Sequence, residues 1–363
     1  MRIGFFRTCG LGDAVQLTPL LRQARADFPE AEIVLFVNRV VGPLFRDCPF
    51  VDRVDALPHE WFQPHPLLRK PLYAKLWGLV RREGPWDLFL TLEPRWYRNL
   101  NFWRVRAGIK AGQVTRGTPG RFLYDHWIEK TRGGRAGMRV HQSRRYLELW
   151  EKATGKTDRG WGYDLRYLPE PETPLEPPLP SRYLCFAPGS GNAFTRVDTK
   201  KWPPEYWAQL ADRVMASGST QVVWLGVEGD LDPALYKGRG VSLMGKANLL
   251  QSVSAIRHSV GLVGNDSGLF HIAMGLDVPA AAFFGPTESG FTGAFRTQRA
   301  RIYEDNRLPC RPCYQETCDY EGELPEAPLE RPFCQALLTP ERIWPDLSGF
   351  FQIDSAAPSP PPS

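Results

Sequence analysis

A strand, a turn of small residues and a helix follow one another near the middle of the second half of the 363-residue chain. Val260–Val263 is apolar enough for a buried strand, and Leu269–Leu276 has helical spacing. The turn between them, Gly264–Gly268, reads GNDSG. Such a turn leaves backbone N–H groups open next to the partial positive charge of a helix N-terminus, so we predict a phosphate site there. Simple capping of the helix by Asp266 or Ser267 is the alternative.

Two further turns of the same kind follow apolar runs. Gly285–Thr287 comes after the strand-like run Ala280–Phe284, and Pro188–Asn192 comes after Tyr183–Ala187. Turns at the ends of successive strands predict a pocket for a nucleotide diphosphate at the carboxyl edge of a parallel sheet. Lys200 or Lys201, downstream of the third turn, would supply charge for phosphate oxygens, although both would also suit an exposed surface.

The first half of the chain opens with a comparable turn. Gly10 and Gly12 permit a tight turn that brings the backbone close to a ligand, and Asp13 at its end could act as a general base or simply cap a helix. The turn is a poor nicotinamide site, because Val15 stands where a third glycine is needed and Asn38 where a ribose-binding acid is needed.

Strand and helix patterns alternate through both halves, which predicts parallel sheets covered by helices. We therefore expect an α/β fold of two doubly wound, Rossmann-like domains that face each other across a cleft. The Pro-rich run from Leu168 to Pro180 can form neither a helix nor a central strand and is expected to be a linker. The expected parts are residues 1–167, the linker 168–180, residues 181–354 and a disordered Pro/Ser/Ala-rich tail, 355–363.

Composition points to a globular protein that does not span a membrane. No apolar run approaches the ~20 residues that a bilayer requires, and Met1–Arg7 is too short for a secretory signal, so we expect a cytoplasmic protein. Residues 1–171 carry 29 Lys and Arg against 18 Asp and Glu, whereas the rest carries 16 against 22. The basic half predicts an anionic partner, either a phosphorylated glycolipid or a membrane surface. A basic face that is simply solvated is the alternative. No nucleic-acid-binding motif accompanies the charge, so we expect no nucleic acid.

Four cysteines lie within 25 positions of one another: Cys310, Cys313, Cys318 and Cys334. In a cytoplasmic protein such a group suggests a structural zinc or iron site, although the spacing is not that of a regular zinc ribbon. Buried, metal-free thiols are the alternative.

The turns described above occur in an order that resembles glycosyltransferase family nine, the lipopolysaccharide heptosyltransferases. The resemblance runs from Met1 to about Pro345 and is loosest between Pro58 and Arg166. It implies a GT-B architecture, with the acceptor on the first domain and the sugar nucleotide on the second. It also implies transfer with inversion, without a catalytic metal or other required cofactor.

The resemblance also implies roles for individual residues. Asp13 would be the catalytic base, and Lys200 would neutralise the diphosphate leaving group. Donor-binding roles would fall to Gly12, Ser190, Thr195, Glu228, Asp266, Ser267, Gly268, Leu269 and His271. The chain departs from the family pattern at Thr8-Cys9 and Glu288, which leaves the exact sugar open.

We therefore expect an enzyme that moves heptose, or a related sugar, from ADP-heptose to an anionic lipopolysaccharide inner-core acceptor. Peripheral contact with the inner face of the inner membrane is part of this expectation. Two alternatives stay open: a heptosyltransferase that modifies autotransporter-type proteins, and a protein that binds nucleotide sugars without transferring them.

Overall fold

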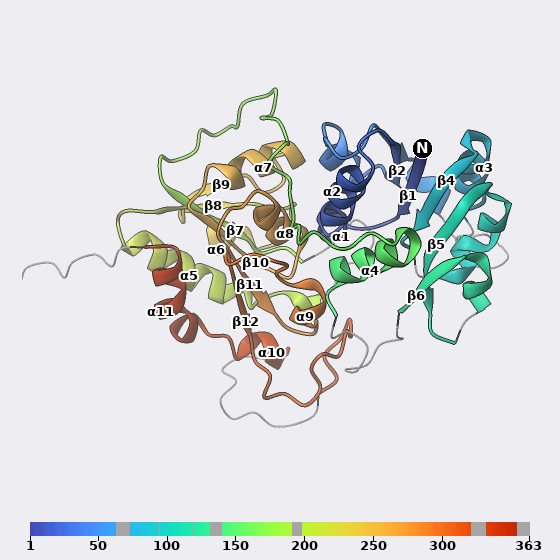
Figure 1. Cartoon of the computed structure of the whole chain (residues 1–363). Helices are drawn as coiled ribbons and strands as arrows, with labels where there is room; N and C mark the ends of the chain where they lie inside the picture. The colour runs from blue at the N-terminus through green and yellow to red at the C-terminus, as the bar shows by residue number, and fades with distance from the viewer. Residues whose placement is uncertain are drawn as a thin grey trace, which may run out of the picture. The chain divides into compact units, whose positions relative to one another are not determined.

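The computed structural model describes residues 1–62, 73–93, 95–117, 119–130, 140–190, 198–320 and 332–353. The predicted tail, 355–363, lies outside these residues. The chain divides into two compact units, Met1–Leu168 and Pro169–Ser363, and each has its own sheet (Figure 1). Residues 168–180 contain neither helix nor strand. Within the described part of the chain, no helix is both long enough and apolar enough to cross a bilayer.

The sheet of the first unit has six parallel strands in the order β3-β2-β1-β4-β5-β6. This is the order of dinucleotide-binding sheets, and it reverses direction between β1 and β4, where such sheets bind ligands. The strands are β1 (Arg2–Arg7), β2 (Glu32–Asn38), β3 (Arg53–Leu57), β4 (Trp86–Thr91), β5 (Ala107–Thr115) and β6 (His126–Lys130).

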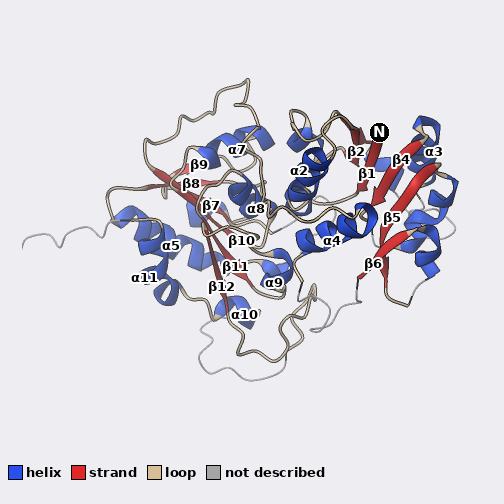
Figure 2. Cartoon of the chain, in the orientation of Figure 1, coloured by secondary structure: helices blue, strands red, loops and turns tan. Residues whose placement is uncertain are grey.

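Helices cover both faces of this sheet (Figure 2). They are α1 (Leu11–Val15), α2 (Thr18–Asp27), α3 (Ala74–Glu83) and α4 (Gln142–Thr154), with the 3₁₀ helices η1 (Gly42–Phe45), η2 (His59–Phe62), η3 (Trp96–Arg104) and η4 (Pro119–Leu123). Successive residues of a strand point to opposite faces. Accordingly, Phe5 stacks on Trp150 of α4, with ring centroids 5.9 Å apart, and Phe6 packs edge-on against Trp77 of α3, at 5.1 Å.

The helix after β1 differs from the single helix that the apolar spacing of Ala14–Ala24 predicts. The structure has two helices, α1 and α2, because Pro19 has no N–H to donate to the carbonyl of Val15. The Thr18 hydroxyl donates to that carbonyl instead, at 2.7 Å. The interruption leaves α1 as a short turn that carries Asp13.

The second unit repeats the topology, with strand order β12-β11-β10-β7-β8-β9. The order in which strands are added along the chain reverses between β7 and β10, although all strands of this sheet are parallel. The strands are β7 (Tyr183–Ala187), β8 (Gln221–Trp224), β9 (Val241–Ser242), β10 (Gly261–Asn265), β11 (Ala280–Phe284) and β12 (Ala300–Glu304). The helices are η5 (Asp198–Lys200), α5 (Pro204–Ala216), α6 (Pro233–Tyr236), α7 (Leu249–Arg257), α8 (Gly268–Gly275), α9 (Ser289–Thr292), α10 (Phe333–Ala336) and α11 (Pro340–Phe350).

Aromatic rings form much of the core under α5. Trp202 stacks on Phe283 of β11, with ring centroids 4.1 Å apart, and meets Trp207 edge-on at 5.2 Å. Trp207 also contacts Phe186 of β7. This packing fixes the chain just after Lys200 against the sheet. The segment from η5 to Trp202, which we call the lysine turn, therefore lies beside the end of β10.

Candidate active site

Lys200 and Asp266 form an ion pair at the carboxyl edge of the second sheet. The Lys200 Nζ donates to Asp266 Oδ2 at 2.7 Å, and the side chains are 24% and 6% exposed. The Thr287 hydroxyl donates to the same oxygen at 2.8 Å. His271 Nε2 lies 3.9 Å from the other oxygen, Asp266 Oδ1. Residues from two of the predicted turns, from η5 and from α8 therefore meet around one carboxylate.

The ionisation of Asp266 is controlled by its neighbours. Burial by itself would raise the pKa of this carboxyl, but the Lys200 ammonium and the His271 side chain outweigh it and hold the pKa well below its usual range. Asp266 is therefore a carboxylate at neutral pH, and it keeps the Lys200 ammonium at the edge of the sheet. An ammonium has three donors, so two remain to Lys200 for another anion after one goes to Asp266.

The N-terminus of α8 lies directly after this carboxylate. Ser267 is the residue before the first turn of the helix, and its side chain does not cap it. Its Oγ is buried and has no hydrogen-bond partner among the residues that the structure describes. The N–H groups of Gly268 and Leu269, in the first turn, have no partner within the helix. These donors and the helix dipole make the position suitable for phosphate oxygens.

Asn265, the last residue of β10, ties two of the turns together. It is completely buried, its Oδ1 accepts from the Trp202 N–H at 3.0 Å, and its Nδ2 donates to the Pro188 carbonyl at 2.6 Å. Pro188 follows β7, the neighbour of β10 at the point where the strand order reverses. The Lys200 turn, the Pro188–Ser190 turn and α8 thus converge at the position where doubly wound sheets bind ligands.

The C-terminal part of the chain fixes the lysine turn from outside. Gln335 of α10 donates its Nε2 to the Lys200 carbonyl at 2.8 Å. Trp202 Nε1 donates to the Leu338 carbonyl at 2.8 Å, and the Tyr206 hydroxyl donates to the Ala336 carbonyl at 3.1 Å. No local motif in the sequence indicates this role for Gln335, because its partner lies 135 positions earlier.

Three more of the predicted donor-binding residues are only partly described. Ser190 is buried after β7, Glu228 is exposed after β8, and Thr195 lies outside the described residues. Asp230, which no sequence motif indicated, lies against the turns that follow β7 and β8. A Cβ added at Gly189 or Gly226 would collide with its carboxylate, and Gly226 has a φ of +146°. Two glycines therefore admit this carboxylate to the carboxyl ends of β7 and β8.

In the first unit, Asp13 lies on α1 just beyond the carboxyl end of β1, after Gly10 and Gly12. Its Oδ1 accepts from Gln142 Nε2 at 2.8 Å, and its Oδ2 lies 3.7 Å from Arg7 Nη2. The side chain is 36% exposed, so a ligand can reach the carboxylate. The capping alternative does not hold, because Gly10 is the N-cap of α1 and no side chain caps that helix.

Two buried charged residues that no sequence motif indicates flank the turn that precedes this aspartate. Arg7 is buried and donates to the Leu92 carbonyl at 2.8 Å, across the switch point from β1 to β4. Glu93 is also buried and accepts from Thr8 Oγ1 and Arg98 Nη1, each at 2.8 Å. Burial opposes ionisation of Glu93, but the arginines outweigh it and lower the pKa of this carboxyl.

The position of Asn38 explains why the first unit lacks a ribose-binding acid. Asn38 ends β2 and is buried, and its Oδ1 accepts from the Cys9 N–H at 3.0 Å. The side chain therefore holds the β1 turn in place instead of facing a ribose. This agrees with the sequence-based argument against a nicotinamide cofactor at this turn.

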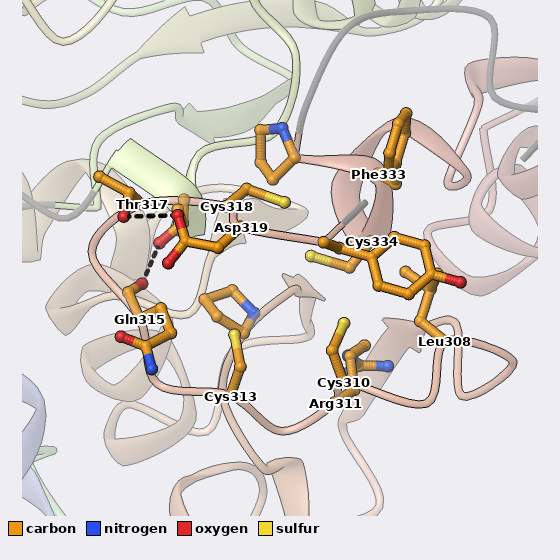
Figure 3. Close-up of a pocket in the computed structure, with 14 residues that line it drawn as sticks. Leu308, Cys310, Arg311, Cys313, Gln315, Thr317, Cys318, Asp319, Phe333 and Cys334 are labelled. Carbon is orange, nitrogen blue, oxygen red and sulfur yellow. Dashed lines mark hydrogen bonds between the residues drawn. The ribbon is translucent and has the colours of Figure 1, made fainter. Parts of the chain in front are cut away.

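The four clustered cysteines line a cavity of about 420 Å³ in the second unit. Figure 3 shows Cys310, Cys313 and Cys318 on one loop and Cys334 on α10, with their sulfur atoms directed toward that cavity. Burial, helped by the other three thiols, raises the pKa of the Cys334 thiol to about 12 against the opposing charge of Arg311. Cys334 is therefore a neutral thiol at pH 7.

This arrangement does not support the structural metal that the cysteine spacing suggested. Among the described residues, no group of three or more His, Cys, Asp or Glu side chains is placed so as to hold a metal ion. The loop has a different visible role, because Arg311 Nε donates to the Gly285 carbonyl at 2.5 Å and Tyr314 N donates to the Pro286 carbonyl at 3.0 Å. It thereby supports the turn from which Thr287 reaches Asp266.

Solved structures with the same fold define the class of the protein. The structure of E. coli heptosyltransferase WaaC with ADP superposes with a TM-score of 0.71 at 17% identity, covering 96% of this chain and 100% of that one. The E. coli ADP-heptose lipopolysaccharide heptosyltransferase II gives 0.64 at 21% identity, with 97% and 99% covered. The protein is therefore an α/β protein of the GT-B type, with two Rossmann-like domains, as the sequence predicted.

Residues 75–323 match the family described as glycosyltransferase family 9 (heptosyltransferase), and the chain belongs to that family. Lipopolysaccharide heptosyltransferase 1 of Pseudomonas aeruginosa is 26% identical over 364 residues, which cover 94% of this chain and 96% of that protein. Lipopolysaccharide heptosyltransferase 2 of Salmonella typhimurium is 35% identical over 112 residues, 28% of this chain and 32% of that protein. The chain is thus a glycosyltransferase, and the resemblance inferred from its motifs is confirmed.

Proposed function

We propose that the protein transfers heptose, or a closely related sugar, from ADP-heptose to an anionic inner-core lipopolysaccharide acceptor on the cytoplasmic side of the membrane. Within the family, the observation that carries this proposal is the Lys200 ammonium, held by Asp266 beside the N-terminus of α8. This group has the charge and donors that a departing nucleotide diphosphate requires.

In the proposed reaction, an acceptor hydroxyl oxygen attacks the anomeric carbon of the sugar and the bond from that carbon to the diphosphate breaks. The hydroxyl proton passes to Asp13, and the bonding electrons leave with ADP, so the configuration at the carbon inverts. Lys200, Ser267 and the N–H groups of Gly268 and Leu269 would bind the diphosphate. Lys200 would neutralise the charge of the diphosphate in this scheme. Transfer is therefore expected to persist in EDTA.

Arg7 and Gln142 support the role of Asp13. Gln142 donates to one oxygen of the Asp13 carboxylate and Arg7 lies near the other, so both residues restrict the orientation of the carboxylate. Asp266 and His271 are positioning residues in this scheme, because Asp266 pairs with the Lys200 ammonium and His271 lies beside the other oxygen of that carboxylate.

The test is Asp13→Asn, assayed for release of ADP with lipopolysaccharide acceptor and for ADP affinity by calorimetry. Loss of a general base should lower kcat by about 10²–10⁴-fold, with ADP affinity unchanged because the residues proposed to bind the diphosphate lie in the other unit. Asp47→Asn, which changes an exposed aspartate outside both turns, is the matched control. Full turnover by Asp13→Asn would exclude it as the base.

The same assay separates the alternatives. A protein-modifying heptosyltransferase would use an autotransporter peptide in place of lipopolysaccharide, and a binding protein would retain ADP affinity with no turnover in the wild type. Thermal shifts with ADP, GDP, UDP and NAD identify the nucleotide, because a ligand that binds only the native state raises its melting temperature. A shift with NAD alone would remove the transferase proposal altogether.

A further inference from the structure

Two 3₁₀ helices of the first unit carry three exposed apolar side chains. Leu100 and Trp103 of η3 are 40% and 61% exposed, and Phe122 of η4 is 78% exposed. Single exposed apolar residues are ordinary on protein surfaces, but a group of large ones is not. We call Leu100, Trp103, Arg104, Arg121 and Phe122 the η3–η4 surface.

The two helices are anchored on the same face of the sheet. Phe102 of η3 and Tyr124, just after η4, are buried with ring centroids 5.6 Å apart. Tyr124 lies directly on Gly112 of β5, where an added Cβ would meet its ring. Trp127 of β6 pairs in register with Gly112, so its 39% exposed side chain emerges on that face too. With their inner residues fixed together, η3 and η4 direct Trp103 and Phe122 away from the sheet.

The charge around these rings has one sign. The thirty residues from Arg95 to Tyr124 contain seven basic residues and no acidic one. The guanidinium of Arg104 lies 5.1 Å from the Trp103 ring centroid, and that of Arg121 lies 5.0 Å from the Phe122 centroid. The acids that flank this segment in sequence are already engaged. Glu93 pairs with Arg98 at 2.8 Å, Asp125 accepts from the Lys110 backbone N–H at 2.8 Å, and Glu129 pairs with Arg116 at 3.9 Å.

Paired aromatic and arginine side chains match the chemistry of an anionic lipid headgroup layer. Tryptophan prefers the membrane–water interface, and basic side chains are attracted to acidic headgroups. Single-stranded nucleic acid also binds basic and aromatic surfaces, but it needs open ring faces for base stacking. Here Arg104 and Arg121 already cover one face of each exposed ring, which favours the bilayer.

We infer that the η3–η4 surface binds the protein peripherally to a bilayer rich in anionic phospholipid, with Trp103 and Phe122 at headgroup depth and Arg104 and Arg121 on lipid phosphates. The inference rests on the proposed function only in that a lipid-linked acceptor places the enzyme at a membrane. The surface itself belongs to the first unit alone, and it needs neither donor nor acceptor to bind.

The experiment uses the full-length protein and vesicles without acceptor, so that its outcome is independent of the transfer reaction. Binding is measured by co-sedimentation with phosphatidylethanolamine/phosphatidylglycerol vesicles and with pure phosphatidylcholine vesicles. The wild type should bind the first and not the second, and high salt should weaken binding. Arg104→Glu/Arg121→Glu should weaken it at least 100-fold, and Trp103→Ser/Phe122→Ser about tenfold or more.

Arg46→Glu/Lys156→Glu is the matched control, because it changes net charge equally at exposed sites outside the surface. It should weaken binding less than fivefold, and every variant should keep the ADP affinity of the wild type, which reports a folded protein. Equal binding to phosphatidylcholine, or equal losses in control and surface variants, overturns the inference. It is also overturned if the surface variants lose affinity for a single-stranded oligonucleotide while vesicle binding is retained. Inactivity with every donor, together with normal vesicle binding, would refute the proposed function alone.

Discussion

Replacing Lys200 by Met removes the cation from a carboxylate that is nearly buried. The pair has an N–O distance of 2.7 Å, with Lys200 24% and Asp266 6% exposed. Breaking a buried pair costs about 3–5 kcal/mol, whereas a surface pair contributes less than about 1 kcal/mol. With one partner a quarter exposed, we expect a loss of about 2–3 kcal/mol, or roughly 4–12 °C in melting temperature for a unit of this size.

The pH dependence of this variant gives a sharper test than its stability alone. In the wild type the pKa of Asp266 is lowered, so the pair stabilises the fold above the unfolded pKa of about 3.9 and its contribution is lost on acidification. Without Lys200, burial becomes the main influence and raises the pKa of Asp266. The variant should then lose stability as pH rises through that higher pKa, so acidification from pH 7 to 5 should narrow the gap to the wild type.

A double-mutant cycle separates folding from ligand binding. Adding Asp266→Asn to Lys200→Met should restore most of the lost stability, because no charge is left unpaired, but it should not restore ADP affinity, which we expect to fall about 10–100-fold. Melting curves and calorimetry measure the two effects, and Lys201→Met is the control for a neighbouring lysine. The reasoning is refuted if Lys200→Met has the melting temperature of the wild type at pH 7, or if the double variant has the ADP affinity of the wild type.

Two more perturbations test the supports of the site. Asn265→Ala leaves the Trp202 N–H and the Pro188 carbonyl unpaired in the interior, so thermal unfolding should show a loss of about 2–4 kcal/mol, and calorimetry should show weaker ADP binding; an unchanged melting temperature would contradict this. Glu170 tests how the segment after the unit boundary is fixed: burial opposes its ionisation, yet hydrogen bonds from Ser254 and Arg257 lower its pKa to about 2. The stability that this carboxylate contributes is therefore present above pH ~4.3 and disappears as pH falls toward 2. Because the carboxylate is half exposed, urea unfolding at pH 7 should show Glu170→Gln less stable than the wild type by under about 1 kcal/mol. At pH 2 the two proteins should be equally stable.

Most inner strands of both sheets were predictable because burial on two faces leaves continuous apolar runs; β5, whose sequence is AGIKAGQVT, has no such run and was not predicted. The run at Val260–Val263 corresponds to β10, and Ala280–Phe284 is β11. The strands without such runs include β3, β6, β9 and β12, which lie at the sheet edges and are half-exposed in most of their described positions. Edge strands need not be apolar on both faces, so pattern alone does not reveal them.

The candidate site divides in the same way. Asp266 and Asp13 were detectable because each follows an apolar run and stands in a small-residue turn. Arg7, Gln142 and Gln335 were not, since each acts on a partner distant in sequence or, like Arg7, looks like an ordinary strand residue. Only the folded chain shows that Gln142 contacts Asp13 and that Gln335 contacts the Lys200 carbonyl.

The attachment of the lysine turn to α10 and to Leu338 has a consequence for how the protein is made. A ribosome will have finished every strand of the second sheet before it synthesises Gln335, whose amide holds the Lys200 carbonyl. A nascent or prematurely terminated chain that stops short of α10 would contain every strand that the structure describes in the two sheets and yet lack this hydrogen bond to the Lys200 carbonyl. We therefore expect a chain that ends before α10 to hold Lys200 less firmly beside Asp266, even though the strands of both sheets are present.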